Sequence, residues 1–290
     1  MILNNGQFYV NSIIRDETWP YILLVNGGPG QSCYGLETLI AHHGYFSTLK
    51  ANIILYDQRG CGRSQKYQSY SHPENIADLE TVIDEVQDQI SQKIDLIIGH
   101  SYGAKILYDY LLAHSCQTKS MFVGTSSHLL IPRLNNLLLD LKYLQKSHPD
   151  AYEEFLTSFS VTDKKSIWEA SEKLAPLFNL NPDRPLYYWA NTQVRALMER
   201  VLATSPHPVN SVVFQQVRKD LYLGEDLLTF EFQRLNCPYR WVLGFFDYIM
   251  GGNLIYQAPN NQIIFDKSGH YPHLEENIRF CEVANEFLVS

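Results

Sequence analysis

Short apolar runs recur along the first 125 residues and alternate with segments whose apolar positions repeat every three or four residues. A run that is apolar along its whole length predicts a strand buried on both faces of a sheet, whereas the longer spacing predicts an amphipathic helix. Strands are therefore expected at residues 8–14, 21–25, 52–56, 94–98 and 120–123, and helices at 76–90 and 102–112. This alternation indicates an α/β fold with a mainly parallel sheet flanked by helices.

The middle of the chain lacks this alternation. From about 128 to 228 strand patterns are missing and amphipathic stretches dominate, with helices expected at 134–145, 167–177 and 187–202. Strands are expected again at 239–243 and 262–265, followed by a closing helix near 275–288. We expect a core domain in two parts, 1–127 and 229–290, with a helical cap inserted at 128–228. The alternative is an insertion that only fills space.

Composition narrows the class of protein. Of 290 residues, 45% are hydrophobic and 19% are charged, which predicts a packed globular core. A net charge of −8 argues against binding to nucleic acid or to an anionic membrane. Five scattered cysteines without a Cys-x-x-Cys pair favour reduced thiols in a cytoplasmic protein. The first residues lack a basic segment followed by a long apolar run, so no signal peptide is expected, and no run of roughly 18 apolar residues occurs, so no membrane span is expected.

A candidate nucleophile lies at the end of one predicted strand. Gly99-His-Ser-Tyr-Gly103 follows the apolar run at 94–98 and precedes helix-compatible residues. This Gly-x-Ser-x-Gly pattern is typical of a nucleophile elbow, in which a tight turn raises a serine hydroxyl above the sheet. The glycines are expected because side chains there would collide with neighbouring backbone. Ser101 is thus the predicted nucleophile.

A serine nucleophile requires a histidine base and an acid that orients it. His270 lies in a loop directly before the final helix, and Asp247 ends an apolar run 23 residues earlier. Asp266 is the nearest rival, but it is too close to His270 in the sequence. His273 could suggest a metal site with His270, but no further ligand spacing completes one, so neither a metal nor another cofactor is expected.

Such a reaction also needs amide donors for the oxyanion. One is expected from Tyr102, the residue after the serine. The other is expected from the Gly-Gly-Pro-Gly segment after the strand at 21–25, with Gly28 as donor. The alternative for this segment is a flexible turn.

Several segments together resemble the proline iminopeptidase (prolyl aminopeptidase) group of α/β-hydrolases. Asn26-Gly-Gly-Pro-Gly30 is similar to the family's oxyanion loop, with Asn in place of His, and Asp57-Gln-Arg-Gly-Cys-Gly-Arg-Ser64 is similar to a segment that braces the site. The elbow, Gly244-Phe-Phe-Asp247 and Ser268-Gly-His270 match its catalytic loops. The resemblance implies an α/β-hydrolase fold, an inserted cap and a Ser101–Asp247–His270 triad.

The resemblance is weaker where an aminopeptidase would recognise a free amine. The family's glutamates correspond here to Tyr222 and Tyr248. The carboxylates that could compensate are Asp220, Glu199 and Glu225, and Arg218 with Lys219 could instead favour an anionic substrate. The aromatic residues expected either to line an apolar pocket or to pack between helices are Tyr187, Tyr188, Trp189, Phe214 and Tyr222.

The sequence therefore predicts a serine hydrolase that cleaves a small amide or short peptide through an acyl-enzyme, most like a prolyl aminopeptidase. An esterase or amidase of the same fold, with no need for a free α-amino group, is the main alternative. A non-catalytic ligand-binding protein is the minor one. The expected partner is a small molecule or short peptide, and the oligomeric state is left open.

Overall fold

A computed structural model describes residues 2–3, 7–158, 160–224, 229–250 and 261–290. Within them, eight strands form one sheet in the order β1-β2-β4-β3-β5-β6-β7-β8. The strands are β1 (Ile2–Leu3), β2 (Phe8–Ile13), β3 (Tyr21–Val25), β4 (Asn52–Tyr56), β5 (Leu96–His100), β6 (Lys119–Val123), β7 (Tyr239–Gly244) and β8 (Gln262–Phe265). β2 is antiparallel to its neighbours β1 and β4, and from β4 to β8 all pairs are parallel. The predicted mainly parallel α/β sheet is confirmed.

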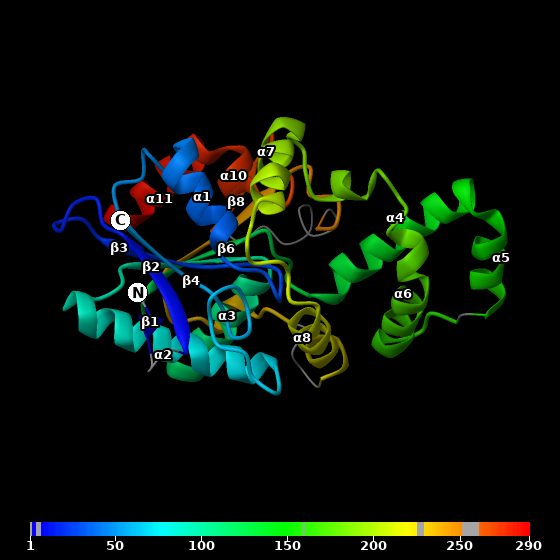
Figure 1. Ribbon diagram of the computed structural model, residues 1–290, viewed down its shortest axis with the longest axis horizontal. Helices are drawn as coiled ribbons and strands as arrows, with labels where there is room; N and C mark the ends of the chain where they lie inside the picture. Colours follow the sequence, from blue (N-terminus) through cyan, green and yellow to red (C-terminus); the bar gives the residue numbers. More distant parts are fainter. Residues whose placement is uncertain (1, 4–6, 159, 225–228, 251–260) are drawn as a thin grey trace.

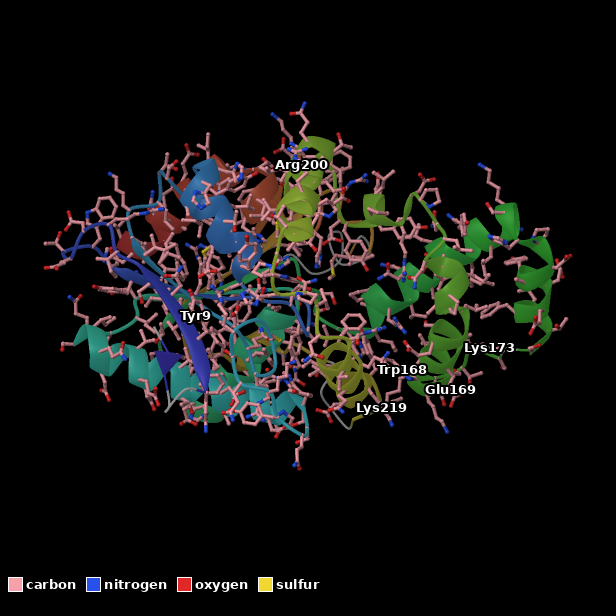
Figure 2. The ribbon with its side chains drawn as sticks, in the orientation of Figure 1. Tyr9, Trp168, Glu169, Lys173, Arg200 and Lys219 are labelled. Atoms are coloured by element: carbon pink, nitrogen blue, oxygen red, sulfur yellow. The ribbon has the colours of Figure 1, made fainter. Side chains whose placement is uncertain are left out.

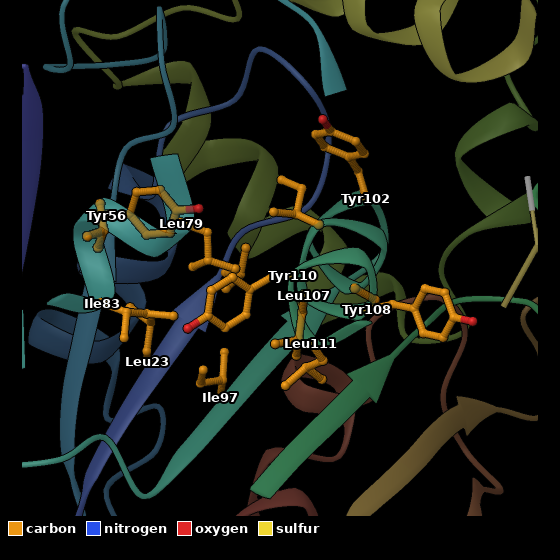
Figure 3. Close-up of a cluster of buried hydrophobic side chains, with 14 of the residues drawn as sticks. Leu23, Tyr56, Leu79, Ile83, Ile97, Tyr102, Leu107, Tyr108, Tyr110 and Leu111 are labelled. Carbon is orange, nitrogen blue, oxygen red and sulfur yellow. The ribbon is translucent and has the colours of Figure 1, made fainter. Parts of the chain in front are cut away.

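Helices cover both faces of this sheet (Figure 1). On one face lie α2 (His72–Ile90) and α3 (Tyr102–His114), and on the other α1 (Tyr34–His43), α10 (Pro272–Glu275) and α11 (Asn277–Val289). The central strands are apolar throughout because they face both layers. In β3, Leu23 packs with α2 and α3, whereas Ile22 packs with α1 and α11. Figure 3 shows the first cluster, in which Leu23 and Ile97 meet Leu79 and Leu107.

The described part of the chain between β6 and β7 is mainly helical. It contains α4 (Leu130–Ser147), α5 (Pro149–Ser158), α6 (Lys164–Phe178), the 3-10 helix η2 (Arg184–Tyr187), α7 (Thr192–Ala203), α8 (Ser211–Leu223) and the 3-10 helix η3 (Phe232–Arg234). Helices α4, α5 and α6 project beyond the sheet (Figure 1) and share a small apolar core that includes Leu144, Phe155 and Leu174. Helices α7 and α8 instead pack against the sheet layers, through Val201 and Val217.

Two predicted helices differ from the structure. The stretch expected to be helical at 187–202 begins only at Thr192, because the Asn191 side chain accepts hydrogen bonds from Gln193 and Val194 and starts the helix there. The closing helix is divided into α10 and α11 by a non-helical Glu276 (φ −124°, ψ 52°). Among the described residues, no helix is both long and apolar enough to span a bilayer.

Candidate active site

The candidate nucleophile Ser101 lies in the turn between β5 and α3. Its backbone has φ 52° and ψ −116°, a conformation that costs an L-residue about 1–3 kcal/mol. A Cβ at Gly99 would lie 2.6 Å from the carbonyl oxygen of Gly103, and one at Gly103 would collide with the carbonyl oxygens of Val25 and Asn26. Glycine is therefore required at both positions, and the tight turn holds Ser101 at the carboxyl edge of the sheet.

The candidate base and acid lie on the loops that follow β8 and β7. Nδ1 of His270 is 2.8 Å from Oδ2 of Asp247, and both side chains are buried. Because an ionised carboxylate can only accept a hydrogen bond, Nδ1 carries the proton and Nε2 of the neutral ring keeps its lone pair. Gly244 lets the two loops approach, since a Cβ there would collide with the carbonyl oxygens of Ser268 and Gly269.

Ser101 and His270 line one cavity of about 470 Å³, within the range of small-molecule sites. The cavity lies between the carboxyl edge of the sheet and helices α4, α6 and α8. Asp247 is fully buried behind His270 and is not part of the cavity wall. The predicted nucleophile and base therefore face a common space, with the predicted acid held behind the base.

The two candidate oxyanion donors line the same cavity. Gly28 has φ +61°, a left-handed conformation that favours glycine. Tyr102 is the first residue of α3, where the amide has no partner within the helix. The Tyr102 hydroxyl lies 3.2 Å from Nδ1 of His72, whose Nε2 is 2.6 Å from Asp109, and these contacts fix the start of the helix.

The segment after β4 braces the Gly28 loop. The Gln58 side chain donates a 2.7 Å hydrogen bond to the carbonyl oxygen of Asn26. The buried Asp57 carboxylate accepts hydrogen bonds from the Cys33 amide at 2.7 Å and from the Arg63 guanidinium at 2.9 Å. The loop is thereby fixed both to β4 and to the start of α1.

Two further histidines lie behind the candidate base, His273 buried and His100 partly buried. The His100 and His273 rings are 4.5 Å apart, and Nε2 of His100 donates a 3.0 Å hydrogen bond to the carbonyl oxygen of His270. Burial, together with the nearby His270, lowers the pKa of His273 to about 3, and burial also moves the pKa of His100 well below its ordinary value. Both rings are therefore neutral near pH 7 and support the His270 loop without adding charge. Within the described ranges, no three His, Cys, Asp or Glu side chains are grouped to hold a metal ion.

The inserted helices contact the candidate base directly. The His270 amide donates a 2.6 Å hydrogen bond to the carbonyl oxygen of Tyr188, and the two rings meet edge to face at 5.6 Å. Nearby, the carboxylate of Glu275 accepts hydrogen bonds from the amides of Ala190 and Asn191, at 2.8 and 2.6 Å. The segment between η2 and α7 is thus fastened to the loop that carries His270.

Comparisons with known proteins agree with the fold described above. The sequence profile of the alpha/beta hydrolase family matches residues 22–283. The chain belongs to this family. Among curated relatives, a proline iminopeptidase of Heyndrickxia coagulans is 25% identical over 289 residues, covering 93% of this chain and 90% of the relative. One of Lactobacillus delbrueckii subsp. lactis is 29% identical over 312 residues, covering 99% and 96%.

Solved structures share the fold of this alpha/beta hydrolase. A proline iminopeptidase-related protein of Thermus thermophilus superposes with a TM-score of 0.67 at 15% identity, covering 97% of this chain and 93% of that one. An esterase of Exiguobacterium antarcticum superposes with a TM-score of 0.53 at 14% identity, covering 98% and 96%. The predicted resemblance to proline iminopeptidases and the α/β-hydrolase fold are both confirmed.

The aromatic residues predicted to bind substrate occupy different environments in this alpha/beta hydrolase. Phe214 and Tyr222 line the cavity. Tyr188 of the same predicted group also lines the cavity, whereas Tyr187 and Trp189 do not, and Trp189 stacks on Tyr271 at 4.0 Å. The Tyr248 side chain is 55% exposed and lies outside the cavity lining.

The carboxylates considered for amine recognition also lie elsewhere. Asp220 accepts a hydrogen bond from the His72 amide at 2.7 Å, and Glu199 pairs with Arg195 within α7. Neither lines the cavity in the described part of the chain, and Glu225 lies outside the described residues. The cavity wall instead contains Asp140 of α4 and Glu172 of α6.

Sequence reasoning missed these two carboxylates and their arginine partners. Asp140 is 3.3 Å from Arg184, and Glu172 is 3.0 Å from Arg133. Burial, opposed by Arg184, raises the pKa of Asp140 to about 6. One usable pattern was present: residues 133, 137 and 140 follow helical spacing on α4, which places them on one face.

Proposed function

We propose that this alpha/beta hydrolase is a serine hydrolase that cleaves a small amide, short peptide or ester through an acyl-enzyme. The observation that carries the proposal is the 2.8 Å hydrogen bond between His270 and Asp247, with His270 and Ser101 lining one cavity. A protein that only binds a ligand has no need of such a pair beside a serine held in a strained turn. The same observation therefore counts against a non-catalytic function.

The proposed reaction has two halves. Oγ of Ser101 attacks the substrate carbonyl carbon while Nε2 of His270 takes the hydroxyl proton, and Asp247 stabilises the resulting imidazolium. The amides of Gly28 and Tyr102 stabilise the oxyanion, a contribution of about 100- to 1000-fold per donor in other enzymes. His270 gives its proton to the leaving group, and the acyl group remains on Ser101. Water, deprotonated by His270, then attacks this ester, which releases the acid and restores the serine.

The nature of the cleaved bond has two candidates. The near full-length similarity to proteins named proline iminopeptidase favours removal of an N-terminal proline. An esterase or amidase without a free-amine requirement is favoured by the cavity wall, where Asp140 and Glu172 both face arginine rather than an open position. An ammonium without a carboxylate partner loses a charge-assisted contact of about 1.5–3 kcal/mol. The cavity therefore supports the second candidate more directly.

Labelling with a fluorophosphonate probe tests the nucleophile. Ser101→Ala should lose all labelling and turnover, because the attacking oxygen is removed. Ser171 offers a matched control in the same cavity, since its hydroxyl donates to the Ile167 carbonyl oxygen at 2.8 Å. Ser171→Ala should keep its labelling. Undiminished labelling of Ser101→Ala would overturn the proposal.

Paired substrates separate the two candidates. The three compounds are proline 4-nitroanilide, its N-acetyl derivative and 4-nitrophenyl butyrate. Hydrolysis of the free proline anilide alone would establish the aminopeptidase. Preference for the blocked anilide or the ester would establish the amidase or esterase.

A further inference from the structure

The helical wall of the cavity carries two arginines that face the same aromatic ring. Arg133 of α4 and Arg218 of α8 both line the cavity. Their guanidinium carbons lie 5.3 and 5.2 Å from the ring centre of Trp168 on α6. Figure 2 shows Trp168 where α6 approaches α8. The two side chains are 12% and 17% exposed, so the cations lie largely out of solvent.

These cations exceed the anions available to them. Among the described residues lining the cavity, Arg133, Arg184 and Arg218 face two carboxylates, Asp140 and Glu172. Asp140 contacts Arg184. A single oxygen of Glu172 serves both other arginines, at 3.0 Å from Arg133 and 3.5 Å from Arg218. One positive charge is therefore left in excess on this wall.

The shared carboxylate leaves one guanidinium donor unpaired. Nε of Arg133 is buried without a hydrogen-bond partner among the described residues. Burial and the positive charge of Arg133 both lower the pKa of Arg218, so the two cations destabilise each other. Glu172 is itself 39% exposed, which weakens its hold on them. A planar anion entering the cavity would find forked donors matched to it.

The aromatic surroundings favour a substrate group that is anionic at its end and apolar along its length. Phe214, Arg218 and Tyr222 follow each other at four-residue spacing on α8, so they share one face of the helix. Arg218 lies 4.5 Å from the Phe214 ring centre, and Arg133 lies 5.7 Å from that of Tyr222. The rings hold the guanidinium groups in place and give the cavity an apolar lining.

We propose that Arg133 and Arg218 bind a carboxylate of the substrate, so that this enzyme prefers small esters or amides that carry a carboxylate away from the cleaved bond. The inference rests on the proposed serine hydrolase function and deepens it by naming the substrate class. According to this inference, the cavity selects a substrate carboxylate, whereas an aminopeptidase would have to accommodate the ammonium group of its substrate.

The test compares anionic esters with neutral counterparts of the same shape. One pair places the carboxylate on the acyl side: the 4-nitrophenyl monoester of adipic acid against 4-nitrophenyl hexanoate. The other places it on the leaving group: the hexanoyl ester of 3-hydroxybenzoate against that of 3-hydroxybenzamide. We expect kcat/KM to favour the anionic member of at least one pair by about tenfold or more, as one charge-assisted contact allows. No preference in either pair overturns the inference.

Variants assign the preference to these residues. Arg218→Gln and Arg133→Gln should each reduce the ratio of anionic to neutral kcat/KM by about tenfold, and Arg218→Lys should retain part of it. Glu172→Gln should raise the ratio, because it removes the competing carboxylate. Lys219 is the matched control: it lies next to Arg218 on α8 but is exposed and outside the cavity lining (Figure 2), so Lys219→Gln should leave the ratio unchanged.

Fluorophosphonate labelling of each variant separates a folding defect from a loss of selectivity. An Arg133 or Arg218 variant that still labels but shows the ratio of the parent enzyme counts against the inference. If Ser101→Ala still hydrolyses the esters, the proposed function itself fails. If Ser101→Ala is inactive and the parent enzyme shows no anionic preference, only the substrate class is wrong.

Discussion

Replacing His273 with leucine should make this alpha/beta hydrolase more resistant to acid. His273 is 8% exposed, and its Nδ1 is buried without a hydrogen-bond partner among the described residues. Burial, reinforced by His270, lowers its pKa to about 3, whereas an unfolded histidine has a pKa of about 6.5. As the pH falls below about 6.5, His273 becomes protonated in the unfolded chain but stays neutral in the folded protein. The contribution of the neutral His273 to the free energy of unfolding is therefore fully present above about pH 6.5 and is lost progressively as the pH falls towards 3.

The size of the effect follows from this difference in pKa. At about pH 5, the unfolded state gains RT ln(1 + 10^1.5), or about 2 kcal/mol, from protonating one such histidine, against about 0.1 kcal/mol at pH 7.5. Desolvation also lowers the pKa of the partly buried His100, so the parent protein should lose a second contribution of the same sign. Leucine suits the site because His273 borders the same small apolar cavity as Leu36 and Phe280.

Urea unfolding at about pH 7.5 and pH 5, analysed by linear extrapolation, measures the effect. Between the two conditions, His273→Leu should lose about 2 kcal/mol less unfolding free energy than the parent. The comparison between conditions removes any constant change caused by the substitution itself. His42, exposed in the last turn of α1, supplies a control, and His42→Gln should lose about as much as the parent. If His273→Leu loses as much stability as the parent, the buried neutral histidine does not cause acid sensitivity.

Three other substitutions have defined outcomes. Asp247→Asn should leave the fold intact and lower kcat by about 10,000-fold, because the His270 tautomer is no longer fixed. The rate is measured on whichever ester the parent hydrolyses, and near-normal turnover would show that Asp247 does not orient His270. Gly103→Ala should lower the free energy of unfolding in urea by about 1–3 kcal/mol and abolish labelling of Ser101, because the new methyl group would collide with backbone oxygens. A variant with the stability and labelling of the parent would mean that the turn can relax. Asp140→Asn should flatten the pH dependence of the free energy of unfolding between about pH 4 and pH 6. Because the pKa of Asp140 is raised to about 6, its protonated carboxyl contributes stability at low pH, and this contribution is lost as the pH rises through 6. A variant with the parent's pH profile would show that Asp140 is not the group that titrates.

The sequence was informative where short-range sterics decide the structure. Strands such as β3 and β4 are buried on both faces, so their unbroken apolar runs identified them. The turn at Ser101 could be predicted because the space around Gly99 and Gly103 admits no side chain. His270 and Asp247 could be proposed as partners because parallel strands bring their loops to one edge of the sheet, and their catalytic roles stay predictions.

Prediction was poorer where packing between distant helices decides the structure. A periodic pattern extended the helix at 187–202 too far, and it did not distinguish Tyr188, which lines the cavity, from its neighbour Trp189, which does not. The pairing of Glu172 on α6 with Arg133 on α4 depends on how those helices cross. No local pattern encodes that crossing.

The hydrogen bonds that join Tyr188 to His270 and Asn191 to Glu275 have a mechanical consequence. The segment from η2 to α7 cannot lift away from the sheet without pulling on the backbone of the candidate base. Helices α4, α5 and α6 have their own apolar core, and α4 is joined to the same segment by the hydrogen bond from Asn136 to the Tyr188 hydroxyl at 3.1 Å and by the Asp140–Arg184 pair at 3.3 Å. A displacement of these helices would therefore be transmitted through Tyr188 to the loop that carries the candidate base.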